Sequence, residues 1–201
     1  MPYLVGMVLA DSRNLLRHSF YQRWLDGTLS SEELRDYAGQ YAFVVAGLPG
    51  WLRRAAVHAP QGASALRRHA NEEDGHLELW QGFASALGSR DAEPNSTVRG
   101  LLVQADELSD GPVGIAVAWA VESQSATVSR EKLTGLEQHY DLGPKAGEYF
   151  RLHATRDLAH VSELETVITC FDQAEVKRAQ QVVDIIQNGL WDLLTSVETA
   201  A

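Results

Sequence analysis

The sequence predicts an all-α protein, a bundle of about seven helices in a single domain that spans residues 1–201. Two observations carry this prediction. Apolar residues recur every three to four positions along most of the chain, and strand-like alternation bounded by hairpin turns is absent. Short turn-forming stretches separate the helical segments, and no internal repeat or long linker divides the chain.

Most of the predicted helices have boundary signals. The first segment stops at DGTLS, and Ser30 or Ser31 with Glu33 then forms a capping box for the second helix. Pro49 predicts a kink inside that helix. The stretches APQG, GSRDAEPNS, SDGP and DLGP each precede one of the next four helices. The expected helices cover residues 4–25, 32–58, 63–87, 97–108, 113–140, 145–171 and 174–197.

Composition excludes several classes of partner and location. The formal net charge is −10 and no Lys/Arg-rich run is present, so we expect neither a nucleic-acid partner nor an anionic membrane surface. The single cysteine, Cys170, rules out an internal disulfide and fits a reducing cytoplasm. The N-terminal residues lack the basic leader of a signal peptide, and the longest apolar run, residues 111–121, is too short to span a bilayer. We therefore expect a soluble cytoplasmic protein.

Polar residues interrupt the apolar face of the sixth predicted helix. In LHATRDLAH, residues His153, Asp157 and His160 stand at positions i, i+4 and i+7, within roughly 60° of one another around a helix. Phe150 and Leu164 continue the same face. Two imidazoles and one carboxylate are therefore expected to point into the core.

Two further helices offer inward carboxylates. In HANEEDGH, Glu72 precedes His76 by four residues and Glu73 precedes it by three, so either pair shares a face if the helix continues through Gly75. In GIAVAWAVESQSATV, Glu122 is the only charge across about four turns. An isolated buried carboxylate is costly unless it is paired, protonated or bound to a metal ion.

The combination of these residues favours a metal site. A single core histidine or an EED turn has an ordinary structural explanation, but Glu and Glu-x-x-His elements on facing helices are typical of dinuclear carboxylate proteins. Nitrogen and oxygen ligands without thiolate suit iron, manganese or zinc. Six ligands exceed the need of one tetrahedral zinc ion, which also lacks redox chemistry. We therefore expect two ions, iron with iron or iron with manganese, that activate dioxygen.

Four segments resemble the heme-oxygenase-like dinuclear metal oxidases, and among them the para-aminobenzoate synthases: HSFYQRWLDGTLSSEELRDYAGQY, NEEDGHLELW, ESQSATVSREKLTGL and HATRDLAH. The resemblance extends from about residue 15 to the last helix. It implies a seven-helix heme-oxygenase-like (TenA/PqqC-like) fold, an Fe/Fe or Mn/Fe centre and dioxygen as co-substrate. The ligands it implies are Glu72, His76, Glu122, His153, Asp157 and His160. This chain has three fewer residues than the family between the glutamate and histidine of the third helix, so Glu73 stays an alternative to the preferred Glu72.

The resemblance also implies that the protein consumes its own residues. In the para-aminobenzoate synthases a tyrosine supplies the aromatic ring and a lysine is implicated as the nitrogen donor. The FY and REK elements place these roles on Tyr21 and Lys132. From the residues alone, Tyr21 is better explained as a core aromatic and Lys132 as a surface lysine, and the resemblance is what raises the functional roles beside these explanations. Tyr37 and Tyr41 either line the same cavity or simply pack. The resemblance further implies a homodimer.

Other functions stay open on the sequence. Another heme-oxygenase-like di-iron oxidase would act on an external amino acid, amine or fatty acid at the same centre. A cofactorless PqqC-like enzyme would not need this ligand set, and a thiaminase would need a nucleophilic cysteine that Cys170 does not match. A non-enzymatic interaction protein is the last alternative, because one chlamydial member of the family is named for a protein partner. The intact ligand set favours an oxidase.

Overall fold

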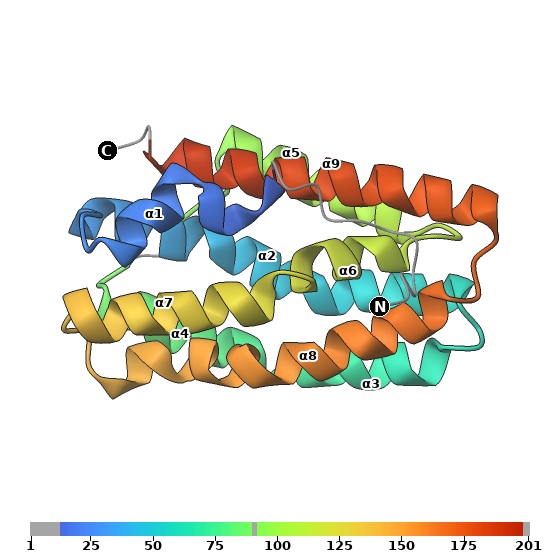
Figure 1. Cartoon of the computed structure of the whole chain (residues 1–201), viewed down its shortest axis with the longest axis horizontal. Coiled ribbons are helices and arrows are strands. Elements are labelled where there is room, and N and C mark those ends of the chain that lie inside the picture. Colours follow the sequence, from blue (N-terminus) through green and yellow to red (C-terminus); the bar gives the residue numbers. More distant parts are fainter. Residues whose placement is uncertain (1–12, 90–91, 199–201) are drawn as a thin grey trace.

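All regular elements in the described part of the chain are helices. The structure is a computed structural model, and it describes residues 13–89 and 92–198. The elements are η2 (Leu15–Arg17), α1 (Ser19–Leu25), α2 (Ser31–His58), α3 (Ala63–Glu73), α4 (His76–Ala86), α5 (Ser96–Ser109), α6 (Ile115–Glu122), α7 (Ser125–His139), η3 (Pro144–Gly147), α8 (Glu148–Ile168) and α9 (Gln173–Glu198). Figure 1 shows α9 and α5 along one long side, α8 and α3 along the other, and α2 and α6 between them.

Two helices that we predicted to be continuous are broken. The segment 63–87 divides into α3 and α4 at Asp74 and Gly75, and the segment 113–140 divides into α6 and α7 at Ser123 and Gln124. When α3 with α4, and α6 with α7, are each counted as one segment, the helices correspond to the seven predicted segments. The prediction for residues 4–12 lies outside the described residues, and the remainder of that first segment forms η2 and α1.

The boundary of α2 follows the predicted capping box. The Ser30 side chain accepts a hydrogen bond from the Glu33 backbone N–H at 3.2 Å, and the Glu33 carboxylate accepts one from the Ser30 N–H at 2.8 Å. These contacts satisfy donors that the helix itself leaves free at its first turn. Arg23 also bonds the Glu33 carboxylate, which ties α1 to the start of α2.

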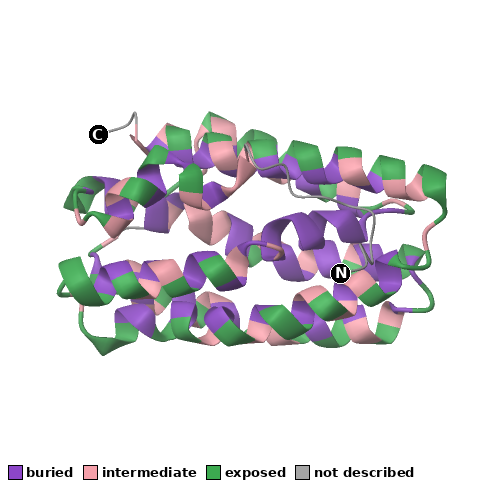
Figure 2. Cartoon of the chain, viewed as in Figure 1, coloured by how far each residue is buried: buried purple, intermediate pink, exposed green. Residues whose placement is uncertain are grey.

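The core runs along the length of the bundle, with buried residues on the inward faces of the helices and exposed residues outside (Figure 2). Helix α6 is the exception, because every one of its residues is buried. It lies among α2, α8 and α9, so the near-continuous apolar sequence GIAVAWAV is covered on all sides. Glu122 is the last residue of α6, so the carboxylate at the end of this helix lies inside the protein.

Candidate metal centre

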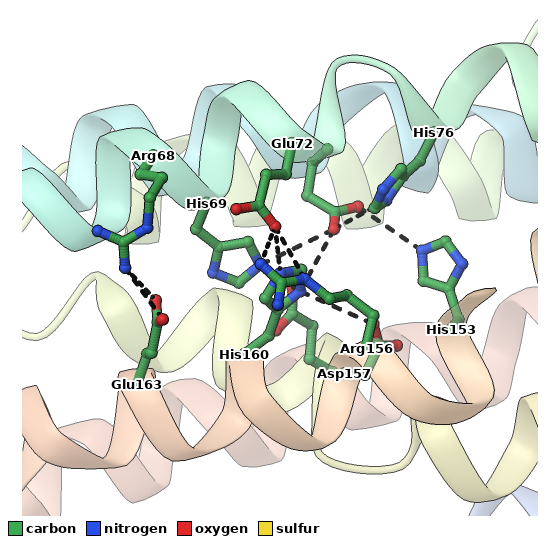
Figure 3. A network of polar contacts seen from close by, with 11 residues as sticks. Arg68, His69, Glu72, His76, His153, Arg156, Asp157, His160 and Glu163 are labelled. Atoms are coloured by element: carbon green, nitrogen blue, oxygen red, sulfur yellow. Dashed lines mark hydrogen bonds and ion pairs between the residues drawn. The ribbon is translucent and has the colours of Figure 1, made fainter.

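Seven titratable side chains, which we call the His/carboxylate cluster, meet deep inside the bundle where α3, α4, α6 and α8 approach one another (Figure 3). All seven are buried, and they come from segments up to 91 residues apart in the sequence (residues 69 to 160). Their members are His69, Glu73, His76, Glu122, His153, Asp157 and His160.

One part of the cluster is formed by Glu73, His76 and His153. The Glu73 Oε1 atom lies 2.9 Å from His76 Nδ1, and Glu73 Oε2 lies 3.8 Å from His153 Nε2. One ligand atom from each residue falls within 4.8 Å of the others. Atoms that each bind a metal at about 2 Å have separations of this order, so the three side chains are placed to share one ion.

A second part contains His69, Glu73, Glu122 and His160, whose ligand atoms also lie within 4.8 Å of one another. His69 Nε2 is 2.7 Å from Glu122 Oε1, and His160 Nδ1 is 3.5 Å from Glu73 Oε1. Asp157 adds a carboxylate oxygen 3.8 Å from His160 Nδ1. Because Glu73 belongs to both parts, the two halves of the cluster are adjacent.

Many polar atoms of the cluster are buried without a hydrogen bond, as is expected for metal ligands in a protein without its metal. In the described residues, ten of its buried nitrogen and oxygen atoms make no hydrogen bond. These are His69 Nδ1 and Nε2, Glu73 Oε1, His76 Nδ1, both Glu122 oxygens, His153 Nε2, both Asp157 oxygens and His160 Nδ1. Buried polar atoms are almost always hydrogen-bonded. Nitrogen and carboxylate oxygen atoms that converge on one another without hydrogen bonds are suitable ligands for divalent transition ions.

The pKa shifts of the carboxylates also indicate a site for cations. Burial, together with the charges of Asp157 and Glu73, raises the pKa of Glu122 well above its usual value. Burial also raises the pKa of Asp157. For Glu73, burial acts to raise the pKa, but the imidazoles of His153 and His76 outweigh it and lower the pKa to about 2. The carboxylates thus compete for positive charge, and bound cations would relieve that competition.

Contacts outside the cluster orient two of the imidazoles. His153 Nδ1 lies 2.7 Å from the Tyr149 carbonyl oxygen, to which it donates, and its Nε2 faces Glu73. His160 Nε2 lies 3.1 Å from Glu72 Oε2, so its Nδ1 faces the cluster. Hydrogen bonds of this kind commonly fix the tautomer and ring direction of a metal-binding histidine.

The structure places Glu73, and not the preferred Glu72, inside the cluster. The Glu73 side chain is 2 % exposed, whereas the Glu72 side chain is 30 % exposed and is bonded by Arg156. Neighbouring residues point about 100° apart on a helix, so only one of them can face the core fully. We therefore replace Glu72 with Glu73 in the candidate ligand set and assign Glu72 to the outer hydrogen bond on His160.

His69 is the residue that the sequence analysis missed. It lies on α3 four residues before Glu73 and three residues after the buried Leu66, so the helical period places all three on one face. That spacing was the available signal. Burial and the neighbouring His160 lower the pKa of His69 to about 3, so its imidazole is neutral and retains a lone pair.

Lys132 is buried, and the surface-lysine interpretation is wrong. Its side chain is 4 % exposed, and its Nζ donates a hydrogen bond to the Tyr37 hydroxyl. Burial lowers the pKa of Lys132 well below its usual value, which favours a neutral amine. Six rings have their centroids within 6 Å of Nζ, and we call them the aromatic box. They belong to Tyr21, Trp24, Tyr37, Tyr41, Trp80 and Phe150.

Tyr21 belongs to the same box. Its ring centroid lies 5.0 Å from Lys132 Nζ, and its hydroxyl lies 3.2 Å from that of Tyr37. Burial raises the pKa of Tyr21, so the phenol stays protonated. The structure thus brings together Tyr21 and Lys132, which are 111 residues apart in the sequence, by placing α1 against α7.

Aromatic side chains link the box to the His/carboxylate cluster. Tyr149 stacks on His153 with a centroid distance of 3.8 Å, and it lines one small cavity together with Tyr21, Tyr41 and Lys132. Burial and the charges of three cluster carboxylates raise the pKa of Tyr41. The cavity has a volume of about 10 Å³, which is room for a single water molecule.

The sequence profile of a haem-oxygenase-like family described as iron-containing redox enzymes matches residues 35–191. The chain belongs to this family. Members of the family are enzymes, and the heme-oxygenase-like all-α fold predicted from the sequence is confirmed.

Three proteins are similar to this chain in sequence or in structure. The 4-aminobenzoate synthases of Chlamydia pneumoniae and Nitrosomonas europaea are each 29 % identical to it over 94 % of this chain, and the matches cover 92 % and 87 % of those proteins. A TenA homologue from Pseudomonas syringae pv. tomato shares the fold with a TM-score of 0.80 at 19 % identity, over 94 % of this chain and 87 % of its own. In the described residues, no helix has the length and apolar character needed to cross a membrane.

Proposed function

We propose that this protein is a dinuclear iron, or manganese–iron, oxidase that uses dioxygen to convert its own Tyr21 into 4-aminobenzoate. The observation that carries the proposal is the cavity of about 10 Å³ that Tyr21 and Lys132 line beside the His/carboxylate cluster. An external amine, amino acid or fatty acid has no room there. The ring and the amine that the product needs are already present in its walls.

The cluster provides a ligand set for two ions. Glu73, His76 and His153 would hold one ion, and Glu122, Asp157 and His160 would hold the other. When bound, the metal pair supplies the electrons and the binding site through which dioxygen becomes an oxidant. The buried surroundings keep water away from the reacting groups.

Conversion of a tyrosyl side chain into 4-aminobenzoate requires three changes. The Cα–Cβ bond is cleaved, Cβ is oxidised to a carboxyl carbon, and the phenolic oxygen is replaced by nitrogen. The first two are oxidations for which dioxygen is the oxidant, and an external electron donor balances the electrons. The third forms a bond between Lys132 Nζ and the ring carbon and releases the phenolic oxygen as water, and it needs an amine with a free lone pair, which burial of Lys132 provides. Hydrolysis of the Cε–Nζ bond, with Cε oxidised to an aldehyde, then leaves the nitrogen on the product.

The aromatic box also supplies a route for the phenolic proton. Tyr21 Oη lies 3.2 Å from Tyr37 Oη, which in turn is bonded to Lys132 Nζ. If the Tyr37–Lys132 hydrogen bond reverses, a proton that leaves Tyr21 as its ring loses an electron can pass to Tyr37, whose own proton moves to the neutral Lys132 amine. The amine must release this proton again before its nitrogen reacts. The three side chains are thereby positioned to hold the proton inside the protein.

The test is a Tyr21→Phe variant, incubated with iron or iron plus manganese, reductant and dioxygen but without added substrate. Phenylalanine keeps the ring in the core and removes only the phenolic oxygen, so metal content and folding should be retained. We expect 4-aminobenzoate from the parent, none from Tyr21→Phe, and loss of mass from the parent chain alone. Tyr140→Phe is the matched control, because Tyr140 is half-buried and does not line the cavity. Undiminished product from Tyr21→Phe would refute self-sacrifice of Tyr21.

A further inference from the structure

His69 has an unusual environment for a core histidine. Its side chain is 1 % exposed and points from α3 into the cluster (Figure 3). In the described residues both ring nitrogens are buried and neither makes a hydrogen bond of normal geometry; Nε2 has only ion-pair contacts with carboxylates. A histidine with a purely structural role normally makes a well-formed hydrogen bond through at least one nitrogen.

The surroundings of His69 are those of a ligand. Its Nε2 lies 2.7 Å from Glu122 Oε1 and 3.9 Å from Glu73 Oε1. Its ring lies against that of His160, with a centroid distance of 3.6 Å and an interplanar angle of 34°. Rings that lie against each other in this way do not hydrogen-bond each other, but both imidazoles can bind one cation beside them.

We propose that His69 is a seventh protein ligand of the dinuclear centre, binding through Nε2 the same ion as His160. This inference rests on the proposed function, because it requires the centre to hold metal. Each ion then has two imidazole ligands: His76 and His153 at one position, His69 and His160 at the other.

The additional imidazole determines which metal the second position accepts. Imidazole nitrogen suits iron, whereas manganese prefers carboxylate, carbonyl and water oxygen. A position with two imidazoles should therefore select iron(II) against manganese(II) more strongly than the same position with one. The parent protein should load iron at the His69 position even when both metals are offered at equal concentration.

The experiment is an anaerobic titration of the metal-free protein with iron(II), manganese(II) and an equimolar mixture, followed by elemental analysis. It compares the parent with His69→Ala and His69→Gln. Glutamine keeps an N–H that can donate to Glu122 but offers only an oxygen ligand. We expect the affinity for the second iron to fall on the order of a hundredfold or more in both variants. Loss of a residue that only orients a ligand usually lowers metal affinity by about 10- to 100-fold. We also expect the manganese-to-iron ratio to rise in both.

The ratio of the two metals separates a ligand from a residue that merely orients Glu122. A positioning role predicts equal losses for both metals and recovery in His69→Gln, and that result would overturn the proposal. His58→Ala is the control, because His58 lies at the surface beside Asp110 and should leave both affinities unchanged. A parent that binds no metal would instead refute the proposed function, which is a separate outcome.

A second measurement on the parent does not depend on the folding of any variant. Cobalt(II) shifts the NMR signals of the protons on imidazoles that bind it. With His69 as a ligand, the cobalt-loaded parent should show four shifted imidazole N–H signals, one for each histidine of the cluster. Three such signals would exclude His69 from the metal.

Discussion

The protein buries ionisable groups in two neighbouring regions and accommodates them in opposite ways. In the His/carboxylate cluster, ten nitrogen and oxygen atoms converge without hydrogen bonds in the described residues, and the pKa of Glu122 is raised by burial and like charge. In the aromatic box, one amine is bonded to a hydroxyl and surrounded by rings, and burial lowers its pKa. The cluster needs added positive charge, whereas burial in the box disfavours the charged form of the amine.

This difference shows how adjacent sites in one core can have different tasks. A cluster whose carboxylates repel one another should gain stability from binding cations, which the proposed function places there to react with dioxygen. A box that keeps an amine neutral and a phenol protonated maintains both in the states required for reaction. The predictions below test each half of this comparison, in order of decreasing effect.

The largest effect is expected when a permanent charge is placed in the aromatic box. Lys132→Arg introduces a guanidinium that cannot lose its proton, so we expect the free energy of unfolding to fall by about 3–5 kcal/mol. Lys132→Met keeps the length and removes the polar group, so it should be at least as stable as the parent. Denaturant unfolding of the metal-free proteins measures both. Lys145→Arg is the exposed control, and a fully stable Lys132→Arg would show that the box tolerates charge.

The next effect concerns the gain from metal binding. At a free metal concentration 100 times Kd, binding to the folded state should stabilise the parent by about 2.7 kcal/mol. Glu122→Gln should lose most of this gain, because a neutral amide oxygen binds a cation much more weakly than a carboxylate does. Without metal, the variant should be as stable as the parent or more so, since the raised pKa of Glu122 already favours the neutral carboxyl.

Thermal unfolding with and without metal tests the Glu122 prediction, with the exposed Glu137→Gln as control. An equal rise in Tm for Glu122→Gln and the parent would remove Glu122 from the ligand set.

The smallest effect, taken over one pH unit, is a pH dependence that comes from Lys132. The unfolded chain binds a proton at this residue below about pH 10.5, whereas the folded protein does so only below the lowered pKa. Unfolding therefore takes up a proton in this window, and the free energy of unfolding falls as the pH falls from 10.5 through it, by at most about 1.4 kcal/mol per unit. Subtracting the profile of Lys132→Met isolates this contribution. A flat difference would mean that the folded amine is protonated.

Local patterns in the sequence determined much of this protein. Helical periodicity and capping residues predicted the helices, and the i, i+4, i+7 spacing placed His153, Asp157 and His160 on the buried face of α8. The apolar sequence around Glu122 predicted a buried carboxylate, because no charge nearby could keep that helix at the surface. These features depend on residues within a few turns of one another.

Only the tertiary structure decided the remaining assignments. Glu72 and Glu73 are adjacent, and the turn at Gly75 together with the packing of α8 put Glu73 inside and Glu72 beside Arg156. His69 faces the cluster because α6 brings Glu122 to it, and Lys132 is buried because α1, α2 and α4 cover it with aromatic rings. Periodicity defines the faces of each helix, but which face is covered, and by which side chains, depends on contacts between segments far apart in the chain.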